Sequence, residues 1–378
     1  MKSALCKDLG IEFPLFAFSH CRDVVAAVTN AGGMGVLGAV GHTPQSLDIE
    51  LRWIDEKVKG KPYGVDLLVP NKMEAKEGGV TAAELEARIP QEHRKHIAGL
   101  LERHGIDTAG LWDAAPPGSY GENLRESGAA ALLDVAFAHP IGLVVNALGV
   151  PPPTMFEHAR AKGVPVGALT GSKEHALRHA AAGVDILVVA GTEAGGHCGE
   201  ISTLVLIPEV LQAMEPYPNI RVLAAGGIAT GRQMAACMAM GAHGAWTASV
   251  WLTTAEAETS PTVKQKMLAA TSRDTVRSRS RTGKYTRQLR SPWTDAWQAE
   301  GAPDPLPMPL QGLAVRRAFA RIDQLAESGH AGAKMLATYY VGQAVGLMNT
   351  EQSARSVVYD FMQDYAEAVE RLSGTVSE

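Results

Sequence analysis

The sequence of 378 residues is poor in cysteine, and its four cysteines lie far apart. They form no C-x-x-C pair, so we expect no metal site; the residues are Cys6, Cys21, Cys198 and Cys237. Scattered thiols of this kind are typical of reduced, cytosolic proteins. The N-terminus has no long apolar stretch like that of a signal peptide, and no apolar run is long enough to cross a membrane. These absences predict a cytoplasmic protein without a membrane partner.

The chain also lacks a large excess of charge of either sign. The formal net charge is −5, and Lys and Arg form no dense run of the kind that lines a nucleic-acid groove. We therefore expect no nucleic-acid partner. Charged residues make up 20% of the chain and hydrophobic residues 46%, which argues against disorder and allows a sizeable core. The length fits one large domain or two ordinary ones.

The sequence is rich in apolar segments that alternate with helical ones. Eight segments have the composition of buried strands: residues 13–18, 34–39, 63–69, 141–148, 164–169, 185–191, 221–227 and 244–249. Eight βα units are the number that closes a (β/α)8 TIM barrel, so we predict this α/β fold. An open, doubly wound sheet is the alternative, but no G-x-G-x-x-G follows the first strand.

Two regions interrupt the alternation. Residues 71–130 are polar and too long for a βα connection, so we predict a helical insertion after the third strand that acts as a lid or as a packing or oligomer contact. The barrel, with this insertion, is predicted to span residues 1–255 and to be followed by a C-terminal segment, 256–378. In that segment we expect an irregular loop and then helices that pack on the barrel: 271–310 for the loop, and 331–348 and 351–372 among the helices.

Glycines follow the sixth and seventh strands, in the sequences AGTEAGGHCGE and AAGGIATGR. Because glycine has no Cβ, its backbone can approach a flat or anionic ligand closely. In TIM barrels the loops after strands seven and eight often bind phosphate through backbone N–H groups. We therefore predict that Gly226, Gly227, Ala248 and Ser249 hold a phosphate-bearing cofactor; the alternative is that the glycines only make tight turns.

These glycine loops resemble those of the nitronate monooxygenase (2-nitropropane dioxygenase) family. The matching pieces are AGGMGVLGA at 31–39, GTEAGGHCG at 191–199, AAGGIATGR at 224–232, GAHGAWTASVW at 241–251 and TGKYTRQLR at 282–290. The resemblance implies an FMN-dependent TIM-barrel enzyme that oxidises alkyl nitronates with O2. The family shares its scaffold with enoyl-thioester reductases, so an FMN-dependent, NAD(P)H-linked reductase or dehydrogenase of an acyl-CoA or other thioester is the alternative.

The resemblance, together with the glycine loops, also implies a set of site residues. The expected FMN-binding residues are Ala17, Phe18, Asp66, Ala194, Gly195, Gly196, Ala225, Gly226, Gly227, Thr247, Ala248 and Ser249. From their positions at the ends of the first and fourth predicted strands, Ser19, His20 and Asn146 are expected to line the substrate pocket; the alternative for His20 is a surface or core position. Asp66 departs from the family, which often has Asn in this strand; a carboxylate cannot donate a hydrogen bond to a flavin carbonyl as an amide can.

His197 is the predicted catalytic residue. A neutral imidazole can take a proton from the carbon next to a nitro group or hold a substrate oxygen, and a cationic one would attract a nitronate. The alternative is a histidine that only stabilises its loop. Cys198, its neighbour, is not expected to act as a nucleophile.

A basic stretch between Arg277 and Arg290 has two interpretations. It is a solvated loop, or it contacts the phosphate of FMN or the nucleotide end of a CoA or NAD(P)H molecule. The second interpretation favours a thioester substrate and leaves NAD(P)H as a candidate electron donor. The sequence permits a homodimer but does not establish one.

Overall fold

A computed structural model describes residues 3–69, 82–113 and 126–375 of the chain. Eight parallel strands close into one barrel: β1 (Leu15–Ser19), β2 (Met34–Gly38), β3 (Gly64–Leu67), β4 (Leu143–Asn146), β5 (Val166–Thr170), β6 (Ile186–Ala190), β8 (Arg221–Ala225) and β9 (Gly244–Thr247). Each predicted strand segment overlaps one of them, so the predicted TIM barrel is confirmed.

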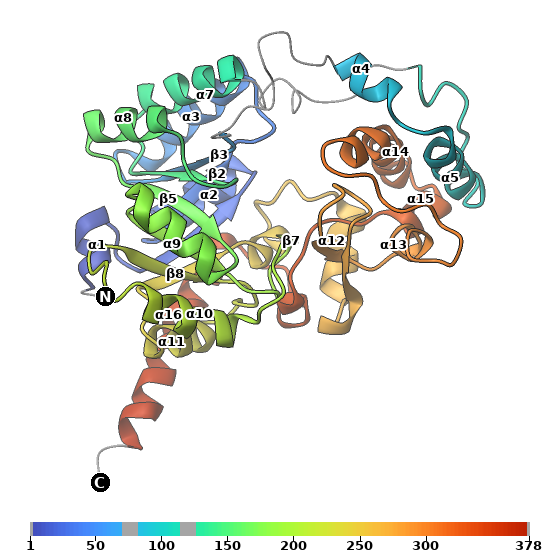
Figure 1. Cartoon of the computed structure of the whole chain (residues 1–378). Helices are drawn as coiled ribbons and strands as arrows, with labels where there is room; N and C mark the ends of the chain where they lie inside the picture. The colour runs from blue at the N-terminus through green and yellow to red at the C-terminus, as the bar shows by residue number, and fades with distance from the viewer. Residues whose placement is uncertain (1–2, 70–81, 114–125, 376–378) are drawn as a thin grey trace.

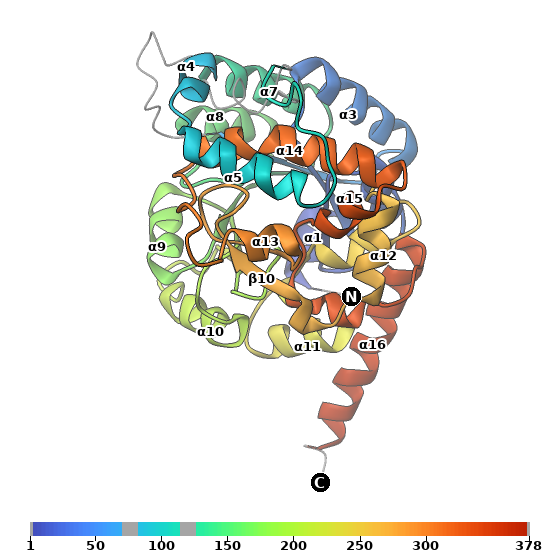
Figure 2. The ribbon, with the colours of Figure 1, turned by 90° about the vertical axis from the view of Figure 1, so that its right-hand side faces the viewer.

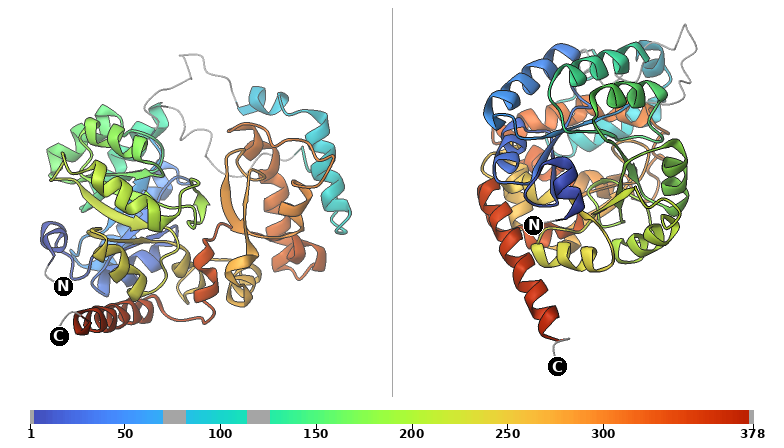
Figure 3. Two further views of the ribbon diagram at one scale, coloured as in Figure 1. Left: turned by 60° about the horizontal axis from the view of Figure 1, so that its bottom comes forward. Right: turned by 90° about the vertical axis from the view of Figure 1, so that its left-hand side faces the viewer.

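Helices surround the barrel, as the view along its axis in Figure 3 (right) shows. They are α2 (Arg22–Asn30), α3 (Pro44–Val58), α7 (Glu126–Ala138), α8 (Pro153–Lys162), α9 (Lys173–Ala182), α10 (Thr203–Ala213) and α11 (Gly231–Ala239). Helix α3 shows how the sequence specifies such an element. Thr43 and Ser46 form a capping box at its start, and its buried residues Leu47, Leu51 and Ile54 repeat at helical spacing.

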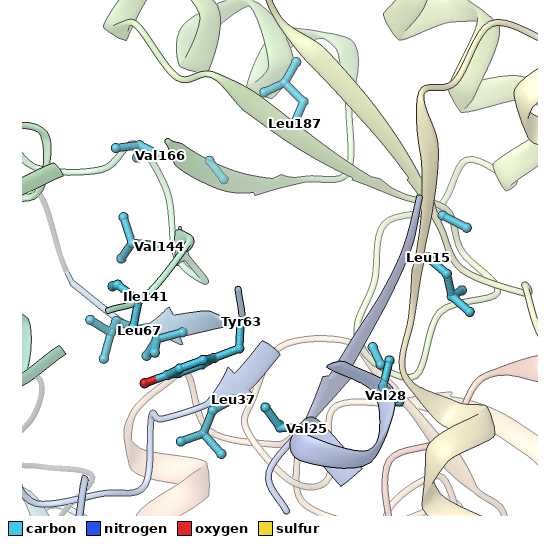
Figure 4. Packing of buried hydrophobic residues seen from close by; sticks show 14 of the residues in the cluster. Leu15, Val25, Val28, Leu37, Tyr63, Leu67, Ile141, Val144, Val166 and Leu187 are labelled. Carbon is cyan, nitrogen blue, oxygen red and sulfur yellow. The ribbon is translucent and has the colours of Figure 1, made fainter. Parts of the chain in front are cut away.

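The strands bury one set of side chains inside the barrel and the alternate set against the helices. The inner set includes Phe16, Val145 and Trp246. The outer set, drawn in Figure 4, packs on the helical layer and includes Leu15 and Leu187. Helix α1 (Ala4–Leu9) adds Leu5 to the inner cluster. This alternation decides which strand residues can face a ligand in the barrel mouth.

A second hydrophobic core lies beside the barrel (Figures 1 and 2) and defines what we term the cap. The cap consists of α4 (Ala82–Ala87), α5 (Gln91–Glu102), α12 (Pro261–Ala269), η2 (Ser272–Asp274), β10 (Thr275–Ser278), β11 (Thr286–Leu289), α13 (Pro292–Ala296), α14 (Leu310–Glu327), α15 (Ala331–Leu336) and η3 (Gln343–Leu347). Glu86 pairs with Arg317 at 2.9 Å and with Arg316, which ties α4 to α14. The insertion after β3 and the C-terminal segment therefore share one core.

Two predictions for the C-terminal segment are wrong. The segment predicted as an irregular loop, 271–310, contains the antiparallel pair β10–β11 and α13. The helix predicted over 331–348 ends at Leu336 in α15, and Tyr340 instead forms an isolated bridge with Gln288. Strand β11 also pairs with β7 (Gly196–His197), and Tyr340 pairs with Gln288; pairing between residues distant in sequence leaves no local periodicity.

The last helix, α16 (Ala354–Gly374), returns to the barrel and packs on α11 and α2, and its end extends beyond the body of the molecule (Figures 1 and 2). Within the described residues, none of the helices combines the length and the apolar character needed to cross a membrane. Parts of the predicted insertion, 70–81 and 114–125, lie outside the described residues.

Candidate active site

Three loops and one tail segment meet at the carboxyl ends of the barrel strands. The tail segment, residues 337–342, follows α15 in extended conformation. Its Gly342 N–H donates to Ser249 Oγ at 2.8 Å, and a Cβ added to Gly342 would lie 2.6 Å from the Glu193 carbonyl oxygen and 3.1 Å from Gly195 N. A Cβ added to Gly227 would lie 3.1 Å from Glu193 Cβ. The loops after β6, β8 and β9 are therefore brought together.

Glu193 fixes the geometry of the loop after β6. Its Oε2 accepts from the backbone N–H of Thr203 at 2.9 Å and from Thr203 Oγ1 at 2.8 Å, at the start of α10. Thr203 Oγ1 also lies 3.0 Å from the Gly226 carbonyl oxygen, in the loop after β8. This network aligns the two glycine loops. No motif in the sequence pointed to Thr203 as part of the site.

The loops after β8 and β9 present unused backbone donors. Gly226 and Gly227 have positive φ values of 91° and 73°, which turn the chain sharply. No hydrogen bond among the described residues uses the N–H groups of Gly227, Ile228 or Ala248. Ser249 Oγ accepts from Gly342, so its own hydrogen remains available. Such backbone donors in half-buried loops of small residues fit an anion such as the FMN phosphate.

His197 lies on the short strand β7 (Gly196–His197), which pairs with β11 of the cap and not with the barrel. Figure 1 shows β7 between the barrel and the cap. The imidazole Nε2 is 3.0 Å from Thr282 Oγ1, and that hydroxyl donates to the Lys284 carbonyl oxygen at 3.2 Å. The network thus assigns the proton to Nε2, which leaves Nδ1 as the acceptor.

The surroundings of His197 keep its imidazole neutral. The side chain is exposed to solvent at its edge, yet the protein around it desolvates the charged form, and this lowers the pKa of His197 below its usual value. The positive charge of Lys284 lowers the pKa further. At neutral pH the residue is therefore an unprotonated base.

The inner layer at the barrel mouth contains Phe18, His20, Asp66 and Trp246. Phe18 lies edge-on to His20 at 5.1 Å and stacks on Trp246 at 6.1 Å, and His20 Nδ1 is 2.8 Å from the Gly38 carbonyl oxygen. Asp66 is 2% exposed, its Oδ1 has no partner among the described residues, and burial raises its pKa well above the usual value. Aromatic side chains beside one unsatisfied polar atom fit a flavin ring.

The remaining predicted FMN-binding residues could contact FMN mainly through their backbone atoms. Ala17 and Thr247 are register partners whose side chains face the helical layer, and Thr247 Oγ1 donates to the Phe16 carbonyl oxygen at 2.8 Å. Ala225 is part of the inner layer, and Ala194 lies in the loop after β6 next to Gly195. None of these residues is displaced from the barrel mouth, but their side chains add no polar group to it.

Two residues predicted for the substrate pocket have side chains that hydrogen-bond to nearby backbone groups. Asn146 is fully buried; its Oδ1 accepts from Val69 N–H, and its Nδ2 donates to the carbonyl oxygens of Leu148 and Gly149. Ser19 Oγ accepts from Cys21 N–H at the start of α2. We therefore leave Asn146 out of the proposed pocket, whereas His20 is exposed in the mouth and stays in it.

Three arginines of the basic stretch between Arg277 and Arg290 are built into the cap. Arg287 is 7% exposed and donates from Nε to the Thr192 carbonyl oxygen, and Arg281 stacks on the Phe319 ring at 3.9 Å. Arg279 donates to two backbone carbonyl oxygens. These three arginines are therefore not free phosphate ligands, whereas Lys284 and Arg290 of the same stretch are exposed. Burial also raises the pKa of the Cys198 thiol, which disfavours a nucleophilic thiolate.

A cavity of about 400 Å³ in the cap adjoins the candidate catalytic residue. Arg281, Phe319, Asp323 and Tyr340 line it together with Thr282, whose hydroxyl contacts His197. A second cavity, of about 550 Å³, lies between α11, the 3-10 helix η1 (Ser249–Thr253) and α16, and contains none of the predicted site residues. The first cavity is therefore the better candidate for substrate.

Comparison with known proteins supports a flavoenzyme. A family model described as nitronate monooxygenase matches residues 2–364. A Mycobacterium tuberculosis protein that is provisionally named a monooxygenase is 54% identical over 378 residues, which are 100% of each chain. A Staphylococcus haemolyticus protein provisionally named a nitronate monooxygenase is 26% identical over 326 residues, 81% of this chain and 84% of its own.

A solved structure extends the similarity to three dimensions. The structure of a nitroalkane oxidase from Streptomyces ansochromogenes matches with a TM-score of 0.78 and 25% identity, and the match covers 98% of this chain and 100% of that one. The similarity therefore includes the cap as well as the barrel.

Proposed function

The chain belongs to the nitronate monooxygenase family and is an FMN-dependent oxidoreductase, and we propose that it oxidises alkyl nitronates with O2. The observation that carries the proposal is the position of a neutral imidazole, His197, in the same group of loops that presents the unused backbone donors. When bound, FMN supplies the electron acceptor for such a reaction.

The residues of the chain would bind the cofactor, move the proton and hold the substrate. The N–H groups of Gly227, Ile228 and Ala248 would hold the phosphate, and Phe18, with the inner layer around it, would support the ring. With a neutral nitroalkane, His197 Nδ1 would take the proton from the carbon next to the nitro group and so form the nitronate, because Nε2–H is held by Thr282. A nitronate supplied as such has already lost this proton. The cavity in the cap would receive the rest of the substrate.

The observation that favoured the thioester alternative is weaker in the structure. That interpretation relied on free basic residues for the nucleotide end of CoA or NAD(P)H, and three of the six, Arg279, Arg281 and Arg287, instead bind carbonyl oxygens and an aromatic ring of the cap. We therefore propose no role for NAD(P)H as an electron donor.

Replacement of the imidazole tests the proposal. We expect His197→Asn to remain folded and to bind FMN, because the substitution leaves the phosphate loops intact, but to oxidise a nitroalkane at neutral pH about 10²–10⁴-fold more slowly. His175→Asn, at an exposed position on α9, is the matched control. The measurement is the rate of anaerobic flavin reduction by a panel of nitroalkanes, nitronates, NADH, NADPH and acyl-CoA thioesters.

Two results of this experiment would contradict the proposal. Unchanged turnover in His197→Asn would remove the imidazole from the chemistry. Fast flavin reduction by NADH or NADPH, with none by any nitronate, would replace the proposed reaction by the thioester alternative.

A further inference from the structure

We infer that Asp66 acts as a neutral carboxylic acid whose buried O–H donates a hydrogen bond to the bound flavin, so that a rise in pH weakens flavin binding. The inference rests on the chain's dependence on FMN and not on the choice of a nitronate as substrate. It assigns to one residue a pH-dependent control over cofactor retention.

The direction of the Asp66 side chain follows from the strand register. Asp66 is the register partner of Gly38 on β2 and of Val145 on β4. Val145 belongs to the inner cluster, and the position of a Cβ on Gly38 is covered by the rings of Phe18 and His20, 2.7 Å away. Register partners project to the same side of a sheet, so the Asp66 carboxyl group points into the mouth of the barrel beside these rings.

The carboxyl group has no partner that would stabilise its charge. It is 2% exposed, and Oδ1 accepts no hydrogen bond from any described residue. Neighbouring strands present Gly38 and Val145 there, and His20 is the titratable group that faces it from β1, with its Nδ1 already at the Gly38 carbonyl oxygen. Among the described residues no ion pair reaches Asp66, and burial is the sole cause of its raised pKa.

A buried acid without a counter-ion avoids the cost of its charge by keeping its proton. The protonated group has one O–H donor, and it can stay buried without penalty only if this donor and the second oxygen meet polar atoms of a ligand. A flavin ring carries hydrogen-bond acceptors along one edge, so the two needs are complementary. Binding therefore favours the protonated form and, above the pKa of the free protein, takes up a proton.

The test is a titration of the flavin-free protein with FMN between about pH 5 and about pH 9, followed by flavin fluorescence. We expect the Kd of the wild-type protein to rise by up to about tenfold for each pH unit above the pKa of Asp66. Asp66→Asn donates from an amide that does not titrate, so its Kd should lack this rise. The phosphate of FMN titrates equally in both proteins and cancels in the ratio of their Kd values.

Asp66→Leu serves as a control of similar shape without a donor and should bind FMN weakly at every pH. A constant wild-type-to-Asn ratio across the range, or an Asp66→Leu protein that binds as tightly as Asp66→Asn, would overturn the inference. If the variants do not fold, titration of the wild-type protein with riboflavin, which has no phosphate, decides it: a Kd that does not rise with pH contradicts the inference. None of these measurements needs turnover, so failure of the nitronate proposal is detected separately.

Discussion

The basicity of His197 depends on a cation that the barrel does not supply. Lys284 lies exposed in the turn between β10 and β11, two residues after Thr282, and its charge adds to the effect of burial on the imidazole. Both influences lower the pKa of His197, so the base is active from a lower pH than a free histidine would be. The cap therefore sets both the tautomer and the protonation state of a residue on the barrel loop.

Removal of this cation should change the pH dependence of activity. We expect Lys284→Gln to raise the pKa of His197 and to move the acidic limb of the kcat/KM profile to higher pH. Because exposed charges interact weakly, the loss of kcat/KM below the midpoint should stay under about fivefold, with no change near pH 8. Lys162→Gln, on the exposed face of α8, is the control. A profile for Lys284→Gln that overlays the wild type would show that another group controls the limb.

At this scale the sequence indicated which residue types matter but not their surroundings. The glycines around His197 and the departure at Asp66 were visible, since both depend on residues adjacent in the chain. The contact with Thr282 joins residues 85 positions apart, and the missing partner of Asp66 is a property of three neighbouring strands. Asn146 shows the converse: a polar residue at a strand end that the scaffold uses completely.

The tail segment joins the loops of the site, and it packs most closely against them at Gly342. The backbone there has φ −79°, which any residue can adopt, so glycine is required only by space. Glu193, Gly195 and Ser249 approach it from the loops after β6 and β9. A side chain at this position must push at least one of these loops away.

We expect Gly342→Ala to weaken FMN binding more than it weakens the fold. The added methyl group would meet the Glu193 carbonyl oxygen at 2.6 Å, and overpacking of this kind costs about 1–3 kcal/mol. The same cost on FMN binding would raise the Kd by roughly 5- to 150-fold. Gly374→Ala, where nothing lies within 4 Å, is the matched control. Equal Kd values for the two variants would show that the tail segment does not position the loops.

The elements of the barrel could be predicted because each is specified locally. The strands are mostly apolar runs, and helices such as α3 carry their own start signals and spacing. Strands β7, β10 and β11 have two to four residues each and a polar composition. Strand β11 pairs with β10 within the cap and with β7 across the boundary between barrel and cap, and such pairs cannot be predicted from the composition of either partner.

The chain passes twice between the barrel and the cap, and these two crossings connect the parts of the molecule. The insertion after β3 leaves the barrel and joins α14, more than 200 residues later, through the ion pairs of Glu86. The chain then leaves the cap after η3 and returns to the barrel as α16. Neither core is built from one continuous stretch, so a sequence boundary near residue 255 does not separate two independent bodies.

The return of α16 is fixed by a polar and an apolar contact with the barrel. Asp364 accepts from the Arg232 backbone N–H at 2.6 Å and from its Nε at 2.6 Å, at the start of α11. Phe361 is 2% exposed and stacks on Trp251 at 6.4 Å, in the 3-10 helix that follows β9. The loop after β9 also holds Ser249, so the last helix supports the same turn that faces the candidate phosphate site.

Truncation of this aromatic side chain should therefore destabilise the whole molecule and not α16 alone. We expect Phe361→Ala to lower the free energy of unfolding by about 3–5 kcal/mol, because it removes a buried ring and leaves a cavity against Trp251. Tyr359→Ala, on the same helix at 67% exposure, should change it by less than about 0.5 kcal/mol. The measurement is denaturant unfolding followed both by tryptophan fluorescence and by circular dichroism. If Phe361→Ala showed an early transition confined to part of the helical signal, with the main transition unchanged, α16 would unfold independently and would not stabilise the barrel.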